Sequence, residues 1–160
     1  MSELNTSADT GASTISPIIE KANLSHVRAL RELWYENFSR YGYCETRFEA
    51  LFFDLNTECL VATDGSHLVG FVLFESSGGH GELLGLAVAR QCRRNRLGDM
   101  LVDTCLKKLK GQGVGRISFH TQPDNLGAQL LFESHGFRGQ GADGYYPSGE
   151  QAVRYEWSAP

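Results

Sequence analysis

The chain has 160 residues, of which 41% are hydrophobic and 21% are charged. This length is enough for one domain with a buried core and too short for two. Its net charge of −4 argues against a general nucleic-acid binder. No apolar run approaches the ~18–20 residues of a membrane-spanning helix. Four cysteines without CxxC spacing favour neither a zinc site nor a disulfide framework. We therefore expect a cytoplasmic protein with no metal site that binds neither nucleic acid nor membranes.

The N-terminal region is expected to begin as a tail. Residues 1–16 are rich in Ser, Thr, Asp and Gly, which indicates a mobile segment, so a single domain would span 17–160. A short strand is predicted over 17–22, and Asn23 is placed to cap the helix that follows. The apolar positions of that helix recur at helical spacing: Val27, Leu30, Trp34 and Phe38.

A second helix and a hairpin are predicted next. Thr46 and Glu49 have the spacing of a capping box, in which a hydroxyl and a carboxylate satisfy backbone donors reciprocally. Two β-rich runs, 59–63 and 68–74, flank Asp64-Gly65, which is a strong hairpin signal.

The C-terminal half alternates strands and helices. A strand over 82–88 precedes a helix over 97–110, which Gly111 is placed to end in a left-handed cap. A strand over 116–121 follows. We then expect a helix over 125–135 stopped by Gly136, a Gly-rich loop, and a last strand over 151–157. The order β-α-α-β-β-β-α-β-α-β-β predicts an α/β fold with helices on both faces of a mixed sheet, including a parallel crossover.

Three arginines stand between the strand over 82–88 and the next helix. Arg93, Arg94 and Arg96 would oppose the helix dipole by about 0.3–1 kcal/mol each. Their presence makes sense if an anion, most simply phosphate, binds the free N–H groups at the helix N-terminus. The alternative is a solvated turn without a ligand.

Two motifs carry a family resemblance. In the first, Leu86-Ala-Val88 precedes Arg93-Arg-Asn-Arg-Leu-Gly98, which looks like a pyrophosphate loop of pattern (Q/R)xxGx(G/A). In the second, Asn125-Leu-Gly-Ala128 continues to Phe132-Glu and Gly136-Phe137. With these motifs the chain resembles the GNAT superfamily of N-acetyltransferases from about residue 18 to 157. The resemblance implies a central mixed sheet of about seven strands flanked by about four helices.

The resemblance also implies an activity: direct transfer of an acetyl group from acetyl-CoA to a primary amine, either a small molecule or a peptide or protein N-terminus. Backbone groups of the strand would pair with the pantetheine arm, and N–H groups of the loop would bind the pyrophosphate. The implied donor-binding residues are Leu86, Ala87, Val88, Arg93, Arg94, Asn95, Arg96, Leu97, Gly98, Asp99, Asn125 and Phe132. The alternative is a non-catalytic sensor or structural module that binds acyl-CoA, and a homodimer is one option for assembly.

Two positions depart from the family pattern. Arg96 stands where the first loop glycine is usual, and we expect it to adopt ordinary helical angles with its side chain turned toward phosphate oxygens. Phe132 stands where a tyrosine is a frequent general acid, and phenylalanine donates no proton. The thiolate leaving group, with a thiol pKa of ~8.5, makes that loss tolerable.

Four residues are candidates for proton transfer. His120 alternates with the apolar positions of its strand and is the first candidate for the base. Glu82 is the second. The alternatives are a structural histidine bonded to a carbonyl and a solvated carboxylate at a strand start. Tyr145 and Tyr146 are candidate acids, within a segment that resembles the YYP…EDA stretch of the ribosomal-protein type of N-terminal acetyltransferase. The resemblance also implies that the loop over 39–45 forms the other wall of the acceptor pocket.

Overall fold

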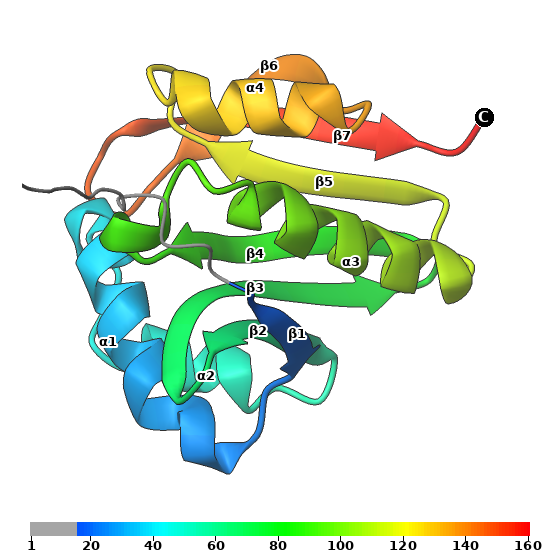
Figure 1. Ribbon diagram of the computed structural model, residues 1–160. Helices are drawn as coiled ribbons and strands as arrows, with labels where there is room; N and C mark the ends of the chain where they lie inside the picture. The colour runs from blue at the N-terminus through cyan, green and yellow to red at the C-terminus, as the bar shows by residue number, and fades with distance from the viewer. Residues whose placement is uncertain (1–15) are drawn as a thin grey trace, which may run out of the picture.

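A computed structural model describes residues 16–160, so all but the last residue of the expected tail lie outside the described residues. Seven strands of this part of the chain form one sheet in the order β1-β2-β3-β4-β5-β7-β6 (Figure 1). The strands are β1 (Ile18–Lys21), β2 (Thr57–Asp64), β3 (His67–Ser77), β4 (His80–Val88), β5 (Arg116–Thr121), β6 (Arg138–Tyr145) and β7 (Gln151–Ser158). The helices are α1 (Val27–Phe38), α2 (Arg47–Phe52), α3 (Leu97–Gly111) and α4 (Leu126–Ser134). The expected element order and mixed α/β sheet are confirmed.

The helices cover both faces of the sheet. A Cβ added at Gly81 of β4 would meet Leu109 of α3, whereas one added at Gly85 would meet Trp34 of α1. α4 lies beside α3, as Figure 1 shows, and His135, just after α4, bonds to Asp99 of α3 at 3.0 Å. The apolar core therefore has two layers, one beneath α3 and α4 and one beneath α1 and α2. No helix within residues 16–160 is long and apolar enough to cross a membrane.

Several local signals behave as expected. Asn23 Oδ1 accepts from the Ser25 N–H at 2.8 Å and so caps a short 3₁₀ turn (Leu24–His26) that leads into α1. The turn after Asp64 closes the hairpin between β2 and β3, with Gly65 at φ +63°. Gly136 ends α4 at φ +89°.

Two predicted caps are wrong. The Thr46 side chain makes no capping hydrogen bond, and the Glu49 carboxylate pairs instead with Arg31 of α1. The Glu49 carboxylate thus binds the Arg31 guanidinium of the neighbouring helix and not the backbone N–H at the start of its own helix. Gly111 is the last residue of α3 and is not left-handed; Gly113, at φ +82°, makes the turn.

The expected Gly-rich loop is in part a strand. Residues 138–145 form β6, which pairs with β7 at the edge of the sheet. All eight of its residues are exposed, so no apolar alternation marks the strand in the sequence. Irregular register at Gly141 and Gly144, which have φ of +90° and +80°, accommodates the glycines.

The sheet opens between β4 and β5. These strands pair in parallel over four residues only, from His80–Arg116 to Leu83–Phe119. Beyond Leu83 they separate, and the described strands offer the rest of β4 no partner on that side (Figure 1). This opening positions the candidate site.

Candidate functional site

The free edge of β4 presents unpaired backbone groups. On its other side the strand continues to pair with β3 through Leu86, Ala87 and Val88, and the Ala89 N–H donates to Val69 O at 2.8 Å. Because N–H and C=O groups alternate in direction along a strand, Leu86 and Val88 direct theirs toward the opening, whereas Ala87 faces β3. The edge can therefore accept an extended ligand as an added strand.

The loop after β4 leads to the N-terminus of α3. The first intrahelical hydrogen bond runs from Met100 N–H to Arg96 O at 3.1 Å. The N–H groups of Leu97, Gly98 and Asp99 therefore precede the helical ladder and have no acceptor within the helix. Such a terminus favours an anion.

Arg96 does not adopt the expected helical angles. Its φ is +61° and its ψ 15°, which is the left-handed conformation that the family's glycine reaches without strain. Arg94 also has a positive φ, of +66°. The cause is the sharp turn that brings Leu97, only 1% exposed, into the core directly after an exposed loop. The helical-angle prediction for Arg96 is therefore wrong.

The three arginines have different surroundings. The Arg93 guanidinium donates through Nε to Val88 O at 3.1 Å and through Nη2 to Asn37 Oδ1 at 3.0 Å. Its backbone N–H donates to Arg90 O at 3.3 Å. Arg93 thus fastens the loop to β4 and α1, whereas Arg94 and Arg96 lie on the surface with Asn95.

The second motif lies across the opening. Asn125 caps α4, its Oδ1 accepting from the Ala128 N–H at 3.2 Å, and it borders the cavity described below. Phe132 is fully buried and stacks on Phe119, with ring centroids 3.7 Å apart. Phe137 meets Phe132 edge-on. These surroundings are apolar, so position 132 supplies cavity wall and no proton.

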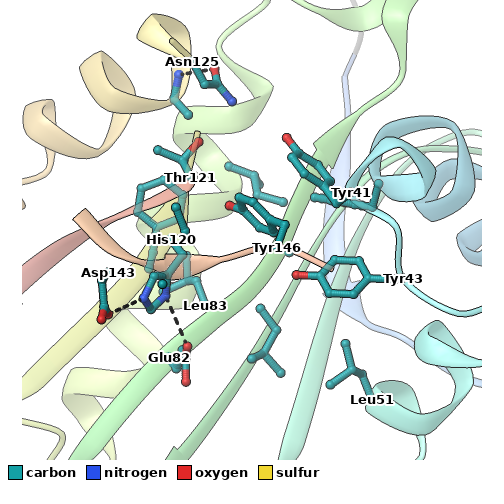
Figure 2. Close-up of a pocket in the computed structure, with 18 of the residues that line it drawn as sticks. Tyr41, Tyr43, Leu51, Glu82, Leu83, His120, Thr121, Asn125, Asp143 and Tyr146 are labelled. Carbon is teal, nitrogen blue, oxygen red and sulfur yellow. Dashed lines mark hydrogen bonds and ion pairs between the residues drawn. The ribbon is translucent and has the colours of Figure 1, made fainter. Parts of the chain in front are cut away.

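A cavity of about 350 Å³ lies where the sheet opens. Its walls come from β4 and β5, from α1, α2 and the loop between them, from α4, and from β6, β7 and the segment that joins them, and they include Leu86, Asn125 and Phe132. Figure 2 shows a histidine and two carboxylates on one side and a group of tyrosines on the other. The open edge of β4 and this cavity are therefore continuous.

The two candidate bases lie together, and a third group joins them. His120 Nδ1 is 3.6 Å from Glu82 Oε1, an ion-pair distance, and His120 Nε2 is 2.7 Å from Asp143 Oδ2, a hydrogen bond (Figure 2). His120 bonds to a carboxylate and not to a carbonyl, whereas Glu82 faces the ring and is also 38% exposed near the start of β4, as the alternative of a solvated carboxylate describes. Asp143 was not predicted, because it lies in the segment expected to be a loop.

Their charges shift one another. The Glu82 carboxylate, followed by that of Asp143, raises the pKa of His120 above its ordinary value in spite of partial burial. In turn His120 lowers the pKa of both Glu82 and Asp143. With two carboxylates and one imidazole, the group has a net charge of −1 or −2, which attracts a cation.

Three tyrosines form the opposite wall. Tyr146 packs on Tyr41, with centroids 4.5 Å apart, and meets Tyr43 edge-on at 6.3 Å. Burial raises the pKa of the Tyr146 phenol well above its ordinary value, so it stays protonated and able to donate. Tyr145 borders the cavity but is 73% exposed.

The two loops that carry the tyrosines are fastened together. The Ser148 N–H donates to Tyr41 O at 2.9 Å. Gly42, at φ +79°, permits this approach, because a Cβ there would lie 2.7 Å from Ser148 N. The expectation that residues 39–45 form a pocket wall is met by Tyr41 and Tyr43.

Solved structures of similar fold include several acetyltransferases. The ribosomal-protein-S18-alanine N-acetyltransferase of Escherichia coli matches with a TM-score of 0.77 and 19% identity over 89% of this chain and 93% of its own. Ard1 of Thermoplasma volcanium matches with a TM-score of 0.80 and 18% identity over 91% and 99%. PaiA N-acetyltransferase of Thermoplasma acidophilum, in complex with coenzyme A, matches with a TM-score of 0.75 and 19% identity over 90% and 99%.

A search of curated protein sequences finds no significant match. The model of the acetyltransferase (GNAT) family matches residues 25–137, a range that includes the loop after β4, His120 and the start of α4. That range is more than half of the chain, so the chain belongs to the acetyltransferase (GNAT) family.

Proposed function

We propose that the protein is an N-acetyltransferase that transfers an acetyl group from acetyl-CoA directly to a primary amine. One observation carries the proposal: the unpaired edge of β4 runs from the N-terminus of α3 to a cavity that contains His120 and two carboxylates. A donor on this edge would thus end beside a proton acceptor.

The residues along the edge fit an acyl-CoA donor. The backbone groups of Leu86 and the N–H of Val88, whose carbonyl already accepts from Arg93, are open to an extended arm, and the N–H groups of Gly98 and Asp99 offer donors to a diphosphate. Arg94 and Arg96 add positive charge beside those donors. Asn125 and Phe132 border the donor from the side of α4.

The cavity fits the transfer step. The acceptor ammonium loses one proton to the His120–Glu82 pair, its nitrogen bonds to the acetyl carbon, and the carbon–sulfur bond breaks. The nitrogen gives up a second proton, to solvent or to the leaving sulfur, as the neutral amide forms. The thiolate leaves with its electron pair and takes up a proton from solvent or from Tyr146. For an amine with pKa ~10.4, deprotonation at pH 7 costs about 4–5 kcal/mol, against about 1 kcal/mol for an α-amine near 8. Amines with a pKa of ~10.4 therefore depend more on the base than α-amines do.

The acceptor is proposed to enter as a cation. The negative group around His120 attracts an ammonium. The tyrosines of the opposite wall favour a cation near their ring faces and contribute apolar area to its carrier. Small amines and peptide N-termini both meet this description, and the E. coli enzyme reported above is by name an N-acetyltransferase of ribosomal-protein-S18 alanine.

The test is thiol release from acetyl-CoA with a panel of polyamines, aminoglycosides, amino acids and N-terminal peptides, together with calorimetry of acetyl-CoA binding. Binding with turnover on at least one amine is the expected result. Binding without turnover across a broad panel would favour the non-catalytic acyl-CoA-binding module, for which the missing hydroxyl at Phe132 is the supporting observation. Absence of binding would refute both functions.

A further inference from the structure

The Asp143 carboxylate lies against one of the two ring nitrogens of His120. A carboxylate only accepts hydrogen bonds, and Asp143 Oδ2 lies 2.7 Å from His120 Nε2. A neutral imidazole beside it therefore holds its hydrogen on Nε2 and leaves a lone pair on Nδ1. Asp143 is on β6 and His120 on β5, with β7 between them in the sheet.

The other side of the ring then presents two acceptors. Nδ1, with its lone pair, lies 3.6 Å from Glu82 Oε1, too far for a direct hydrogen bond. A group with several N–H donors can hydrogen-bond to both atoms at once when its nitrogen lies about 2.9 Å from Nδ1 and from Oε1. An ammonium group has that form and a charge opposite to that of Glu82.

We propose that Asp143 is a positioning residue that holds His120 in the Nε2–H tautomer, so that Nδ1 and Glu82 together receive the ammonium of the acceptor. This inference rests on the proposed function, and it names a residue that acts through His120 without contact with the acceptor. Asp143 also faces solvent, its side chain being 55% exposed, so the proton taken up at the ring has a route out of the cavity.

The other charged groups around His120 leave this role to Asp143. Arg154 of β7 stands opposite His120 in register, but its guanidinium is paired with Glu156. His80 of β4 bonds to Ser118 at 3.1 Å. From the helical side the cavity is lined by Tyr43, whose pKa is raised by burial and which therefore stays neutral, and by Arg47 of α2, whose guanidinium lies over the Tyr43 ring.

Three variants separate geometry from charge. We expect Asp143→Ala to lower kcat about tenfold on the plateau of the pH–rate profile. This loss is smaller than the ~10²–10⁴-fold contribution of a complete general base, because Glu82 still faces the ring. Asp143→Asn, which retains an acceptor oxygen without charge, should lose less, and Asp143→Glu should recover most of the activity. Glu150→Gln is the matched control, since it removes a carboxylate from the same β6–β7 hairpin without contact with His120, and it should leave kcat unchanged.

The pH profile adds a second readout. Asp143 raises the pKa of His120, so removal of Asp143 lowers that pKa. The ring then stays neutral down to a lower pH, and the acid limb of the pH–rate profile moves to lower pH. Asp143→Ala and Asp143→Asn should both show this shift. A purely structural loss would lower kcat without moving the limb, and that result would overturn the inference.

A measurement without substrates separates this inference from the proposed function. Nitrogen NMR of the imidazoles, assigned by the signal missing in His120→Ala, should show Nε2–H in the neutral wild-type ring and a loss of that preference in Asp143→Ala. An unchanged tautomer and titration in Asp143→Ala would overturn the inference even if the enzyme is active. Conversely, a wild-type protein that acetylates no amine would refute the proposed function, whatever the tautomer.

Discussion

Substitution of Arg96 by glycine should stabilise the protein and leave donor binding intact. Arg96 immediately precedes α3 at φ +61° and ψ 15°. An L side chain in this conformation brings its Cβ close to the backbone carbonyl, whereas glycine has no Cβ. The same residue also places a cation beside the positive end of the α3 dipole.

The magnitude follows from opposing contributions. Left-handed backbone costs a residue with a side chain about 1–2 kcal/mol, and that cost disappears in the glycine variant. Glycine loses more backbone freedom on folding, which takes back about 0.5–1 kcal/mol. The net gain in the free energy of unfolding is therefore about 0.5–1 kcal/mol, or roughly 2 °C in Tm for a chain of this size.

Two controls isolate the backbone effect in urea and thermal unfolding. Arg96→Ala removes the charge and the long side chain but retains the Cβ, so it should gain little. Arg90→Gly places glycine in the 3₁₀ turn Arg90–Cys92, away from positive φ, and should lose about 0.5–1 kcal/mol. If Arg96→Gly is no more stable than Arg96→Ala, the strain at this position has been misjudged.

Calorimetry with CoA tests the second half of the prediction. Backbone N–H groups of Gly98 and Asp99 persist in the glycine variant, so the affinity should be equal or higher. A tenfold loss, about 1.4 kcal/mol, would mean instead that the Arg96 guanidinium itself binds phosphate.

Three further substitutions test the site and the core. His120→Ala should lower kcat more at pH 7 than at pH 9, because alkaline solution deprotonates the amine without help; equal losses in the two pH–rate measurements would remove His120 from proton transfer. Gly42→Ala should cost about 1–3 kcal/mol in urea unfolding, since its φ is +79° and the new Cβ would lie 2.7 Å from Ser148 N; an unchanged midpoint would show that the two loops separate freely. Leu109→Ala should cost about 2–5 kcal/mol by the same assay, because Leu109 is 0% exposed on the face of α3 that packs on the sheet, and a cost under 1 kcal/mol would contradict its place in the core.

The local structure of the proposed donor side was largely predictable from the sequence. Leu86 to Val88, the arginine loop and Asn125 all belong to short contiguous motifs whose roles depend on local chain direction. Asn125 caps α4 as its residue type favours. The conformation of Arg96 escaped prediction because the burial of Leu97, a tertiary contact, imposes the left-handed turn.

The acceptor side was predictable only in part. His120 and Glu82 were identified separately, and their proximity depends on the parallel register that pairs Glu82 with Ser118. Asp143 carried no signal, since all of β6 is exposed and glycines interrupt it. Tyr41 and Tyr43 were expected only as part of a wall without a defined role.

By itself, the sequence determined the order of strands and helices apart from the place of β6, the mixed sheet and the motifs of the family, because periodicity, caps and turn residues act within a few positions of one another. Only the tertiary structure decided that the sheet opens beyond Leu83 and that His120 lies between Glu82 and Asp143. Those three side chains come from β4, β5 and β6, and strand order and register bring them together. Register depends on pairing across the whole sheet, so no local pattern records it.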